Sequence, residues 1–368
     1  MDNNKNIQLA FAATNKEWEE IIPQLTEVES TKDYVLYGKD NQYPEYLYSL
    51  YNDVSTLKTI IEGTADYVIG NSVECNIKGF ETQVNTKGDT MRELVRLCAR
   101  DWLIYGGYYI QVIRNKAGEV RELYYIDFRY MRSSKKNDVF YYSEDFGKKY
   151  VRTNKRVVYP KYLPEAKSVA SSIVFVSNNK SSTYPIPKFS GSIKACEIER
   201  AIDTYHLSSI ENGFGGSYII NFLNGIPTDE VKNEIEKNVN EKFCGASNAG
   251  RVLINFANGK DNATTLEKLT TEDFGEKYKA AAERAKNQIF TAFRAQPILF
   301  GIMKENNGFS QDEYLQAFAI YNRTVVKTIS DTIIDSIDRI FGMKESVVIK
   351  PFSVQVTDNT LTDKEVVS

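Results

Sequence analysis

Histidine is nearly missing from this sequence, since His206 is the only one among 368 residues. A Ser-His-Asp or Cys-His catalytic arrangement could therefore use only that residue. It falls in a predicted acid-rich helix, and we interpret it as a structural or solvated histidine. No Cys-x-x-Cys pair occurs, which argues against a zinc site. We expect no cofactor, and we expect free thiols in a reducing cytosol at the four widely spaced cysteines: Cys75, Cys98, Cys196 and Cys244.

Long apolar runs and basic segments are absent as well. No run approaches the ~20 apolar residues of a membrane span, and the start MDNNKN lacks the basic stretch of a secretory signal. We therefore expect no membrane association. The net charge of −3 and the pI near 5.6 argue against tight DNA binding through a basic face, although they permit DNA to slide past. No Gly-x-x-x-x-Gly-Lys-Ser/Thr phosphate loop occurs.

The first half of the chain contains helix signals followed by strand signals. A helix is predicted over 53–69, where Gly70 stops it. Thr90 begins another helix, because Thr90 and Glu93 form a capping box, and Gly106 ends it. The pattern then changes to a Tyr-rich β region that begins with a hairpin. The predicted strands of this half are 72–77, 108–114, 120–126, 139–142, 149–152, 157–159 and 172–176.

The next stretch predicts two helices that enclose a small folded insert. The first helix covers 191–212, the insert covers 213–260, and the second helix covers 271–294. Acidic residues outnumber Lys and Arg four to two in the first helix, and small residues in the second allow close helix approach. We expect an antiparallel stalk with a head at its tip. The insert is a predicted β-α-β unit with a strand at 217–223, a helix at 228–243 and a strand at 251–256.

A long helix is predicted over 311–341, after a capping box at Ser310 and Glu313. Gly342 ends it, and a short strand follows at 347–349. The apolar stripe of this helix has near-heptad spacing: Leu315, Phe318, Val325, Ile329, Ile333, Ile337 and Ile340.

Two residue groups leave an enzymatic or nucleic-acid role open. Asp101, Asp127 and Glu119 could hold Mg²⁺ for a nuclease, although no motif pairs them and solvated or ion-paired acids are the default interpretation. The Tyr-rich region could stack nucleobases, but tyrosines on a sheet surface or at a subunit contact are more common.

Four segments taken in order resemble the portal proteins of tailed bacteriophages, in the siphovirus-like branch. They are DWLIYGGYYIQVIRNKAGEVRELYYID at 101–127, ENGFGGSYIINF at 211–222, CGASNAGRVLINFANG at 244–259 and AAAERAKNQIFTAFRAQPILFG at 280–301. The resemblance implies an α+β, portal-like fold with a mixed α/β wing, a two-helix stem, a small β-α-β clip insert and a long helix near the C-terminus. It maps a flexible arm at 1–33, a wing at 34–190, stem helix 1 at 191–212, a clip at 213–260, a stem helix 2 region at 261–295, a tunnel loop at 296–310, a long wing or crown-base helix at 311–341 and a short crown or tail at 342–368.

The resemblance also implies a function. A portal is a non-enzymatic homo-oligomeric ring, a dodecamer in the family, at one capsid vertex. Double-stranded DNA is packaged and ejected through it and binds only weakly. The implied partners are the terminase packaging motor, the major capsid protein or scaffold, and the head–tail adaptor. The implied location is the virion, with the host cytoplasm during assembly.

The resemblance implies three sets of site residues. Acids of stem helix 1 would border the DNA channel: Glu197, Glu199, Asp203 and Glu211. Polar residues of the tunnel loop would touch passing DNA: Gln296, Lys304, Glu305, Asn306 and Asn307. Residues of the clip would contact partners: Tyr218, Asn224, Asn248 and Arg251. The alternatives are a metal-dependent DNA-processing enzyme and another structural head–tail connector component.

Overall fold

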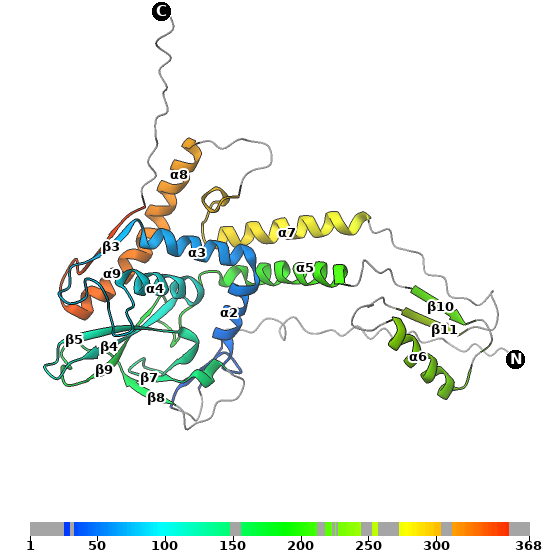
Figure 1. Ribbon diagram of the computed structural model, residues 1–368, viewed down its shortest axis with the longest axis horizontal. Coiled ribbons are helices and arrows are strands. Elements are labelled where there is room, and N and C mark those ends of the chain that lie inside the picture. Colours follow the sequence, from blue (N-terminus) through cyan, green and yellow to red (C-terminus); the bar gives the residue numbers. More distant parts are fainter. Residues whose placement is uncertain are drawn as a thin grey trace, which may run out of the picture. The chain divides into compact units, whose positions relative to one another are not determined.

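The computed structural model describes residues 26–29, 33–147, 156–211, 218–222, 225, 227–243, 252–256, 272–302 and 311–352. Two compact units can be distinguished, and each is taken by itself. Unit 1 holds the chain up to Lys194 and again from Ile289, and unit 2 holds Ala195–Gln288. Helices and strands occur in both units (Figure 1), and this mixed composition confirms the expected α+β class.

Helix α4, Met91–Tyr105, forms where its capping signals predicted it. The Glu93 backbone N–H donates to the Thr90 hydroxyl at 3.2 Å, and the Thr90 N–H donates to the Glu93 carboxylate at 2.7 Å. Gly106 ends the helix in a left-handed conformation with φ +84°. The capping box and the terminal glycine therefore fix both ends of α4 from local sequence alone.

The prediction of one helix over 53–69 is wrong at its start. Helix α2 spans Tyr43–Asp53 and α3 spans Ser55–Ile69, with Val54 extended between them at φ −98° and ψ 108°. Asp53 therefore ends α2 instead of beginning α3. The sequence analysis missed α2 because its first turn contains Pro44 and its buried face is made mostly of tyrosine and leucine. Pro is well tolerated in that first turn, where its missing N–H has no intrahelical partner.

Unit 1 also contains two three-stranded antiparallel sheets. The first has the order β5-β4-β9 and contains the predicted hairpin, and the second has the order β6-β7-β8. β6, with only three residues, was not predicted. The strands are β4 Gly107–Arg114, β5 Val120–Ile126, β9 Ser171–Ser177, β6 Met131–Ser133, β7 Val139–Tyr142 and β8 Val157–Pro160.

Two further strand pairs join distant parts of unit 1. β1 Glu27–Glu29 pairs with β2 Val35–Tyr37, and β3 Ser72–Cys75 pairs with β12 Val347–Lys350, both antiparallel. The second pair places the predicted short strand at 347–349 beside the one at 72–77. It ties the end of the described chain to its first quarter.

The predicted long helix is interrupted by a π-helical segment. Helix α8 spans Gln311–Tyr321, the π segment spans Asn322–Val326, and α9 spans Lys327–Phe341 before the left-handed Gly342. A π turn contains one extra residue, so the buried stripe shifts at this point. Of the expected stripe the buried positions are Ile329, Ile333, Ile337 and Ile340, whereas Ala317, Tyr321 and Val326 are buried in place of Leu315, Phe318 and Val325.

Unit 2 contains the helices and strands expected around the insert. Helix α5 spans Ile193–Glu211 and α7 spans Glu272–Ala292, so each helix begins or ends just inside unit 1. The two helices meet in unit 2, where the Tyr205 and Tyr278 rings stack at 4.9 Å. Between them in the sequence, β10 and β11 pair in parallel with α6 as the connection, as the β-α-β prediction requires. These elements are β10 Tyr218–Phe222, α6 Asp229–Phe243 and β11 Val252–Phe256.

The core of unit 1 is built largely from aromatic rings. Tyr37 stacks on Tyr184 at 4.2 Å, and Tyr105 stacks on Phe128 at 4.5 Å. The buried hydroxyl of Tyr37 donates to the carbonyl of Pro185 at 3.0 Å. Tyr108, Tyr109 and Tyr184 of the β region are buried as well, so tyrosines of that region fill the core to a greater extent than the sequence analysis allowed, since it placed them on a sheet surface. Each buried hydroxyl of this kind needs a partner, and Pro185 supplies one.

Other expectations fall outside the described residues, among them the strand at 149–152 and the Ser310 end of the capping box. Cys75, Cys98 and Cys196 are free thiols, and Cys244 also lies outside the described chain. Among the described helices, none is long and apolar enough to cross a membrane.

Candidate functional site

The four acids proposed for the channel do not share one environment on α5. Glu197 and Glu199 are buried, with 8% and 9% of their surface exposed, and Asp203 is exposed. Both Glu197 oxygens accept from the Arg200 guanidinium, at 2.7 and 2.9 Å. Glu211 lies in the last turn of α5, and its side chain is outside the described residues. The sequence found the acids but not the burial of two of them.

Helix α7 carries more basic than acidic side chains over its described part. Lys279 and Arg284 are exposed, and Lys286 lies 3.7 Å from Glu283. Alanines occupy 280–282 and 285 of this helix, and the close helix approach expected from them stays a prediction. His206 of α5 is exposed and lies 6.3 Å from the Tyr278 ring, which agrees with a solvated histidine.

The start of the predicted tunnel loop is an ordered turn. Gln296 is exposed and extended, and a 3-10 turn follows at Pro297–Phe300, closed by a left-handed Gly301. The other proposed loop residues lie outside the described chain: Lys304, Glu305, Asn306 and Asn307.

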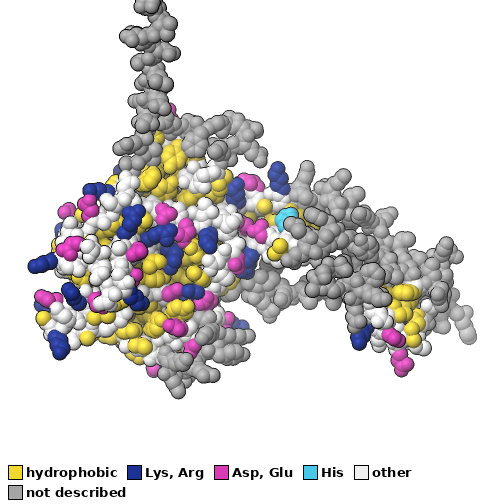
Figure 2. All heavy atoms as spheres, in the orientation of Figure 1, with side chains coloured by type: hydrophobic (Ala, Val, Ile, Leu, Met, Phe, Trp, Pro, Cys, Tyr) yellow, Lys and Arg dark blue, Asp and Glu magenta, His cyan; other side chains and the backbone are white. Residues whose placement is uncertain are grey.

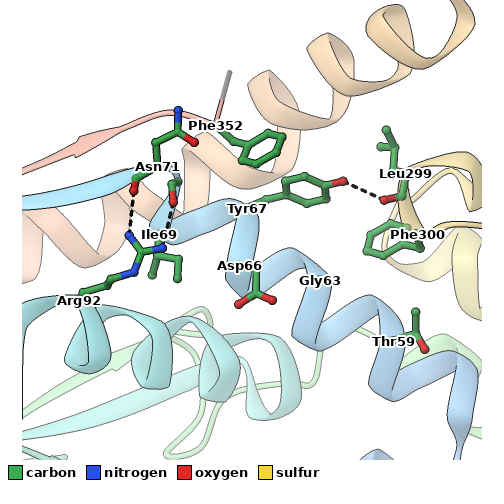
Figure 3. Close-up of a pocket in the computed structure, with 11 residues that line it drawn as sticks. Thr59, Gly63, Asp66, Tyr67, Ile69, Asn71, Arg92, Leu299, Phe300 and Phe352 are labelled. Atoms are coloured by element: carbon green, nitrogen blue, oxygen red, sulfur yellow. Dashed lines mark hydrogen bonds between the residues drawn. The ribbon is translucent and has the colours of Figure 1, made fainter. Parts of the chain in front are cut away.

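Aromatic side chains anchor this turn to α3 (Figure 3). The Tyr67 hydroxyl donates to the Leu299 carbonyl at 2.8 Å, and the Phe300 ring lies edge-on to Tyr67 and Tyr321 at 6.2 and 6.0 Å. A Cβ at Gly63 would come within 2.9 Å of Phe300, so the glycine allows the ring to approach the helix. Sequence reasoning missed this anchor, because Tyr67 and Leu299 are 232 positions apart.

A cavity of about 550 Å³ adjoins the anchored turn (Figure 3). Its charged side chains have protein partners. The Arg92 guanidinium donates to the carbonyls of Gly70 and Asn71, both at 3.2 Å, and Asp66 pairs with Arg96 at 2.9 Å. The described lining therefore offers no nucleophile paired with a base, which a hydrolytic site would need.

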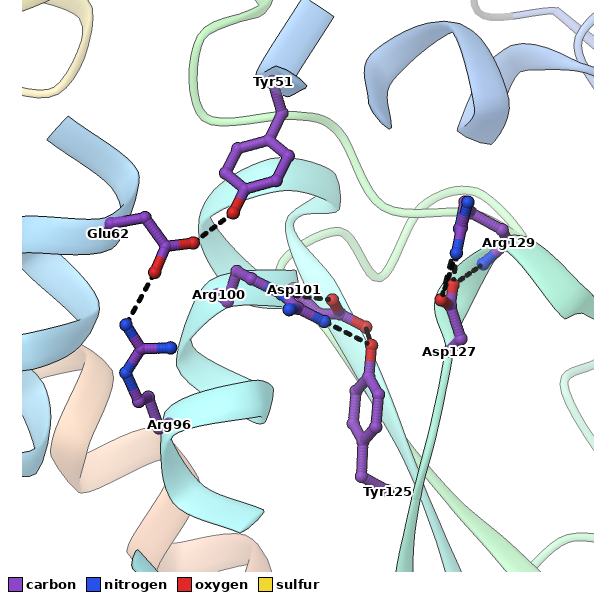
Figure 4. Close-up of polar contacts among 8 residues, drawn as sticks. All are labelled: Tyr51, Glu62, Arg96, Arg100, Asp101, Tyr125, Asp127 and Arg129. Atoms are coloured by element: carbon purple, nitrogen blue, oxygen red, sulfur yellow. Dashed lines mark hydrogen bonds and ion pairs between the residues drawn. The ribbon is translucent and has the colours of Figure 1, made fainter. Parts of the chain in front are cut away.

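The carboxylates considered for Mg²⁺ are held by protein groups instead (Figure 4). Asp101 is buried and accepts from the Tyr125 hydroxyl at 2.9 Å, while Arg100 donates to that same hydroxyl at 3.1 Å. Burial, with Asp127 nearby, raises the pKa of Asp101 well above its usual range. Asp127 pairs with Arg129 at 2.7 Å.

The third carboxylate, Glu119, accepts from Asn115 in an exposed turn at 2.9 Å. Among the described residues, no group of three His, Cys, Asp or Glu side chains could hold a metal ion. The described chain therefore gives no support to the nuclease alternative. On the face shown in Figure 2, Lys and Arg are interspersed with Asp and Glu over unit 1, so this face has no single-sign patch for nucleic acid.

The proposed clip residues are mostly outside the described chain. Tyr218 begins β10 and pairs in register with Val252 of β11. Asn224, Asn248 and Arg251 lie outside the described residues. The parallel β10-α6-β11 unit is thus the part of the predicted clip that the structure describes.

Comparison with known proteins gives a family and a fold. The family described as "Phage portal protein" matches residues 82–342. Three solved structures of gene transfer agent (GTA) particles are similar to this chain. The neck of the native particle computed with C12 symmetry has a TM-score of 0.52 and 16% sequence identity, with 85% of each chain covered. The neck of the empty particle computed with C6 symmetry has a TM-score of 0.53 and 15% identity (84% of this chain and 85% of that chain covered), and the virion of the native particle has a TM-score of 0.50 and 18% identity (84% of each chain covered). At these identities the structures show the fold alone. No curated protein matches the sequence significantly.

Proposed function

This chain belongs to the phage portal protein family, and we propose that it forms a channel for double-stranded DNA at a capsid vertex. The family is structural and not enzymatic. The observation that carries the function is the family match over 82–342, which runs from before α4 to the end of α9. The neck structures computed with C12 and C6 symmetry support a homo-oligomeric ring, and we propose that this ring has twelve subunits.

The parts of the portal follow the two units. Residues 34–190 form the wing, α5 and α7 form the stem, and 213–260 form the clip. The stacked Tyr205 and Tyr278, with the β-α-β unit between their helices in sequence, support this division. The clip contacts the packaging motor and later the head–tail adaptor through Tyr218 and its neighbours Asn224, Asn248 and Arg251. The wing faces the capsid protein or scaffold, in the host cytoplasm during assembly and then in the virion.

The stem acids border the channel and keep DNA from binding tightly. DNA carries one negative charge per ~1.7 Å of helix axis, so a wall of Lys and Arg would hold it. Acids on α5 would instead repel it: Glu197, Glu199, Asp203 and Glu211. The tunnel loop after the anchored turn adds a few weak polar contacts, beginning with Gln296. No energy-yielding site is needed in this chain, because the motor drives packaging.

Electron microscopy of the purified full-length chain tests the ring. We expect annular particles with a central opening in negative stain. We also expect no Mg²⁺-dependent cleavage of double-stranded DNA. A compact monomer at all concentrations, or cleavage that disappears in an Asp127→Asn variant, would overturn the proposed function.

Reversing charge on the stem tests the channel wall. Particles that carry Asp203→Lys together with Glu211→Lys should contain normal rings but change from filled to largely empty. The physical reason is that the added cations bind phosphates and resist sliding. The readout is nuclease-protected DNA per particle. The neutral pair Asp203→Asn with Glu211→Gln is the matched control and should be intermediate. Normal filling by the lysine variant would contradict the repulsion argument.

A further inference from the structure

A groove of about 710 Å³ runs between helix α9 and strand β12 in unit 1. Apolar side chains form its floor. Val68, Val326 and Val347 are buried there, and Ile334 and Ile349 are half-buried. The volume falls within the range of ligand-binding pockets in proteins, roughly 300–1,000 Å³. The groove therefore has room for an occupant of its own.

Strand β12 forms one side of the groove with the edge of its two-stranded sheet. Among the described strands, β3 is the only one that pairs with β12. The Asn76 N–H donates to the Ser346 carbonyl at 2.9 Å, and this bond shows which residues of β12 face β3. Because bonded residues alternate along an antiparallel pair, the N–H and C=O groups of Val347 and Ile349 point away from β3. An edge of this kind is a template on which another strand can pair.

Helix α9 forms the opposite side of the groove and lines it with carboxylates. Asp331 and Asp335 are exposed there. Asp331 pairs with Lys327 at 3.1 Å in an exposed ion pair, which contributes little in water. The Asp335 carboxylate makes no ion pair with another described residue. With Asp338 and Glu345, acids outnumber lysines four to two among the described lining residues, so the groove favours a positively charged occupant.

We propose that this groove binds an extended segment of a partner protein that alternates apolar and basic residues, and that the segment pairs with β12 as the third strand of the β3-β12 sheet. Main-chain hydrogen bonds to Val347 and Ile349 hold the backbone of the segment, and its apolar side chains cover Ile334. Its lysine or arginine side chains meet Asp331 and Asp335. This interaction goes beyond the proposed channel and uses no residue of the stem or the clip.

The dimensions of the two sides match those of a short strand. From Lys327 to Asp338, α9 rises about 16 Å, and the residues of β12 extend about 13 Å. Asp331 and Asp335 lie about 6 Å apart along the helix axis, close to the ~6.6 Å between alternate residues of a strand. Two basic residues at positions i and i+2 of the segment therefore reach both acids together.

Fluorescence anisotropy with the full-length chain tests the charge complementarity. The probe is a labelled synthetic peptide of alternating valines and lysines, which should bind saturably, whereas a peptide of alternating valines and glutamates should not bind. An Asp335→Lys variant should bind the lysine peptide about tenfold or more weakly, and it should keep its helical circular dichroism because Asp335 is exposed. Asp312→Lys, at an exposed position of α8, changes the net charge equally and is the matched control. It should bind like the wild type.

Backbone methylation of the peptide tests strand pairing without changing the protein. The N–H groups of alternate residues in a strand point to the same side, so methylating either all valines or all lysines removes donors on one side only. We expect one methylated peptide to lose binding and the other to retain it. Equal binding of the two, equal binding of the lysine peptide by Asp335→Lys and the wild type, or no binding by the wild type would each overturn the proposal. Annular particles that bind no peptide would refute the groove and leave the channel standing.

Discussion

An Arg132→Ala variant is expected to unfold with a free energy lower than that of the wild type by about 3–5 kcal/mol. The Arg132 side chain is fully buried in unit 1, at 0% exposure. Its guanidinium donates to the side-chain and backbone oxygens of Asn41 at 2.5 and 2.6 Å, and to the carbonyls of Arg129 and Met131 at 2.8 and 2.7 Å. Truncation would leave these buried acceptors without a donor, and a buried acceptor without a partner carries its full desolvation cost.

The substitution would destabilise more than β6, because Asn41 also fixes the conformation of the segment before α2. Asn41 has φ +66°, and its side-chain oxygen also accepts from the Tyr37 N–H at 3.0 Å. Carbonyls of Asn41, Arg129 and Met131 and the Phe146 ring at 5.0 Å surround the Arg132 charge, and burial lowers the pKa of Arg132. Arg132 therefore joins the segment that follows β2 to the second sheet through buried hydrogen bonds.

Arg121→Ala is the matched control, since Arg121 is exposed on β5. It should change the free energy of unfolding by about 0.5 kcal/mol or less. Both variants can be followed by urea unfolding monitored by circular dichroism. An Arg132→Ala variant that unfolds at the wild-type urea concentration would show that the network contributes little.

Gly106→Ala is expected to cost about 3 kcal/mol or more. Gly106 has φ +84°, and a Cβ there would lie 2.3 Å from the Ile186 carbonyl oxygen and 2.5 Å from the Asn178 side-chain nitrogen. Asn178 holds this crossing together, because its N–H donates to the Gly106 carbonyl at 2.9 Å and its side chain donates to the Ile186 carbonyl at 2.8 Å. The added methyl group would force these groups apart.

Comparison with Gly342→Ala separates the cost of the left-handed backbone from the cost of the close contact at Gly106. Gly342 also ends a helix in the left-handed region, with φ +65°, but a Cβ there would meet no atom within 4 Å. Its substitution should cost only the backbone term, about 1–2 kcal/mol. The measurement is the unfolding midpoint of the two variants in parallel. Equal losses would mean that the close approach of the 178–186 segment adds nothing.

Local sequence signals predicted the elements that end at capping residues and glycines. The Thr90 capping box, the stops at Gly106 and Gly342, and the hairpin of β4 and β5 all lie within a few residues of the features that encode them. The break between α2 and α3 escaped prediction, because no glycine marks it and Val54 is an ordinary helix residue. The extra residue of the π segment escaped as well, because no proline or glycine marks it in the sequence.

The candidate site was predictable in composition but not in arrangement. The acids of α5 are visible in the sequence, yet the burial of Glu197 and Glu199 depends on tertiary packing. The anchor from Tyr67 to Leu299 joins residues 232 positions apart, and no spacing rule reaches that far.

The π segment at Asn322–Val326 limits which deletions this chain can tolerate. Loss of one residue there would restore regular α-helix and keep α8 and α9 continuous. It would also rotate every α8 side chain by about 100° about the helix axis. Phe318 now lies 5.5 Å from Tyr67, next to the anchored turn, and it would swing away. A single-codon deletion at this point should therefore survive in evolution only together with a new set of aromatic partners for that turn.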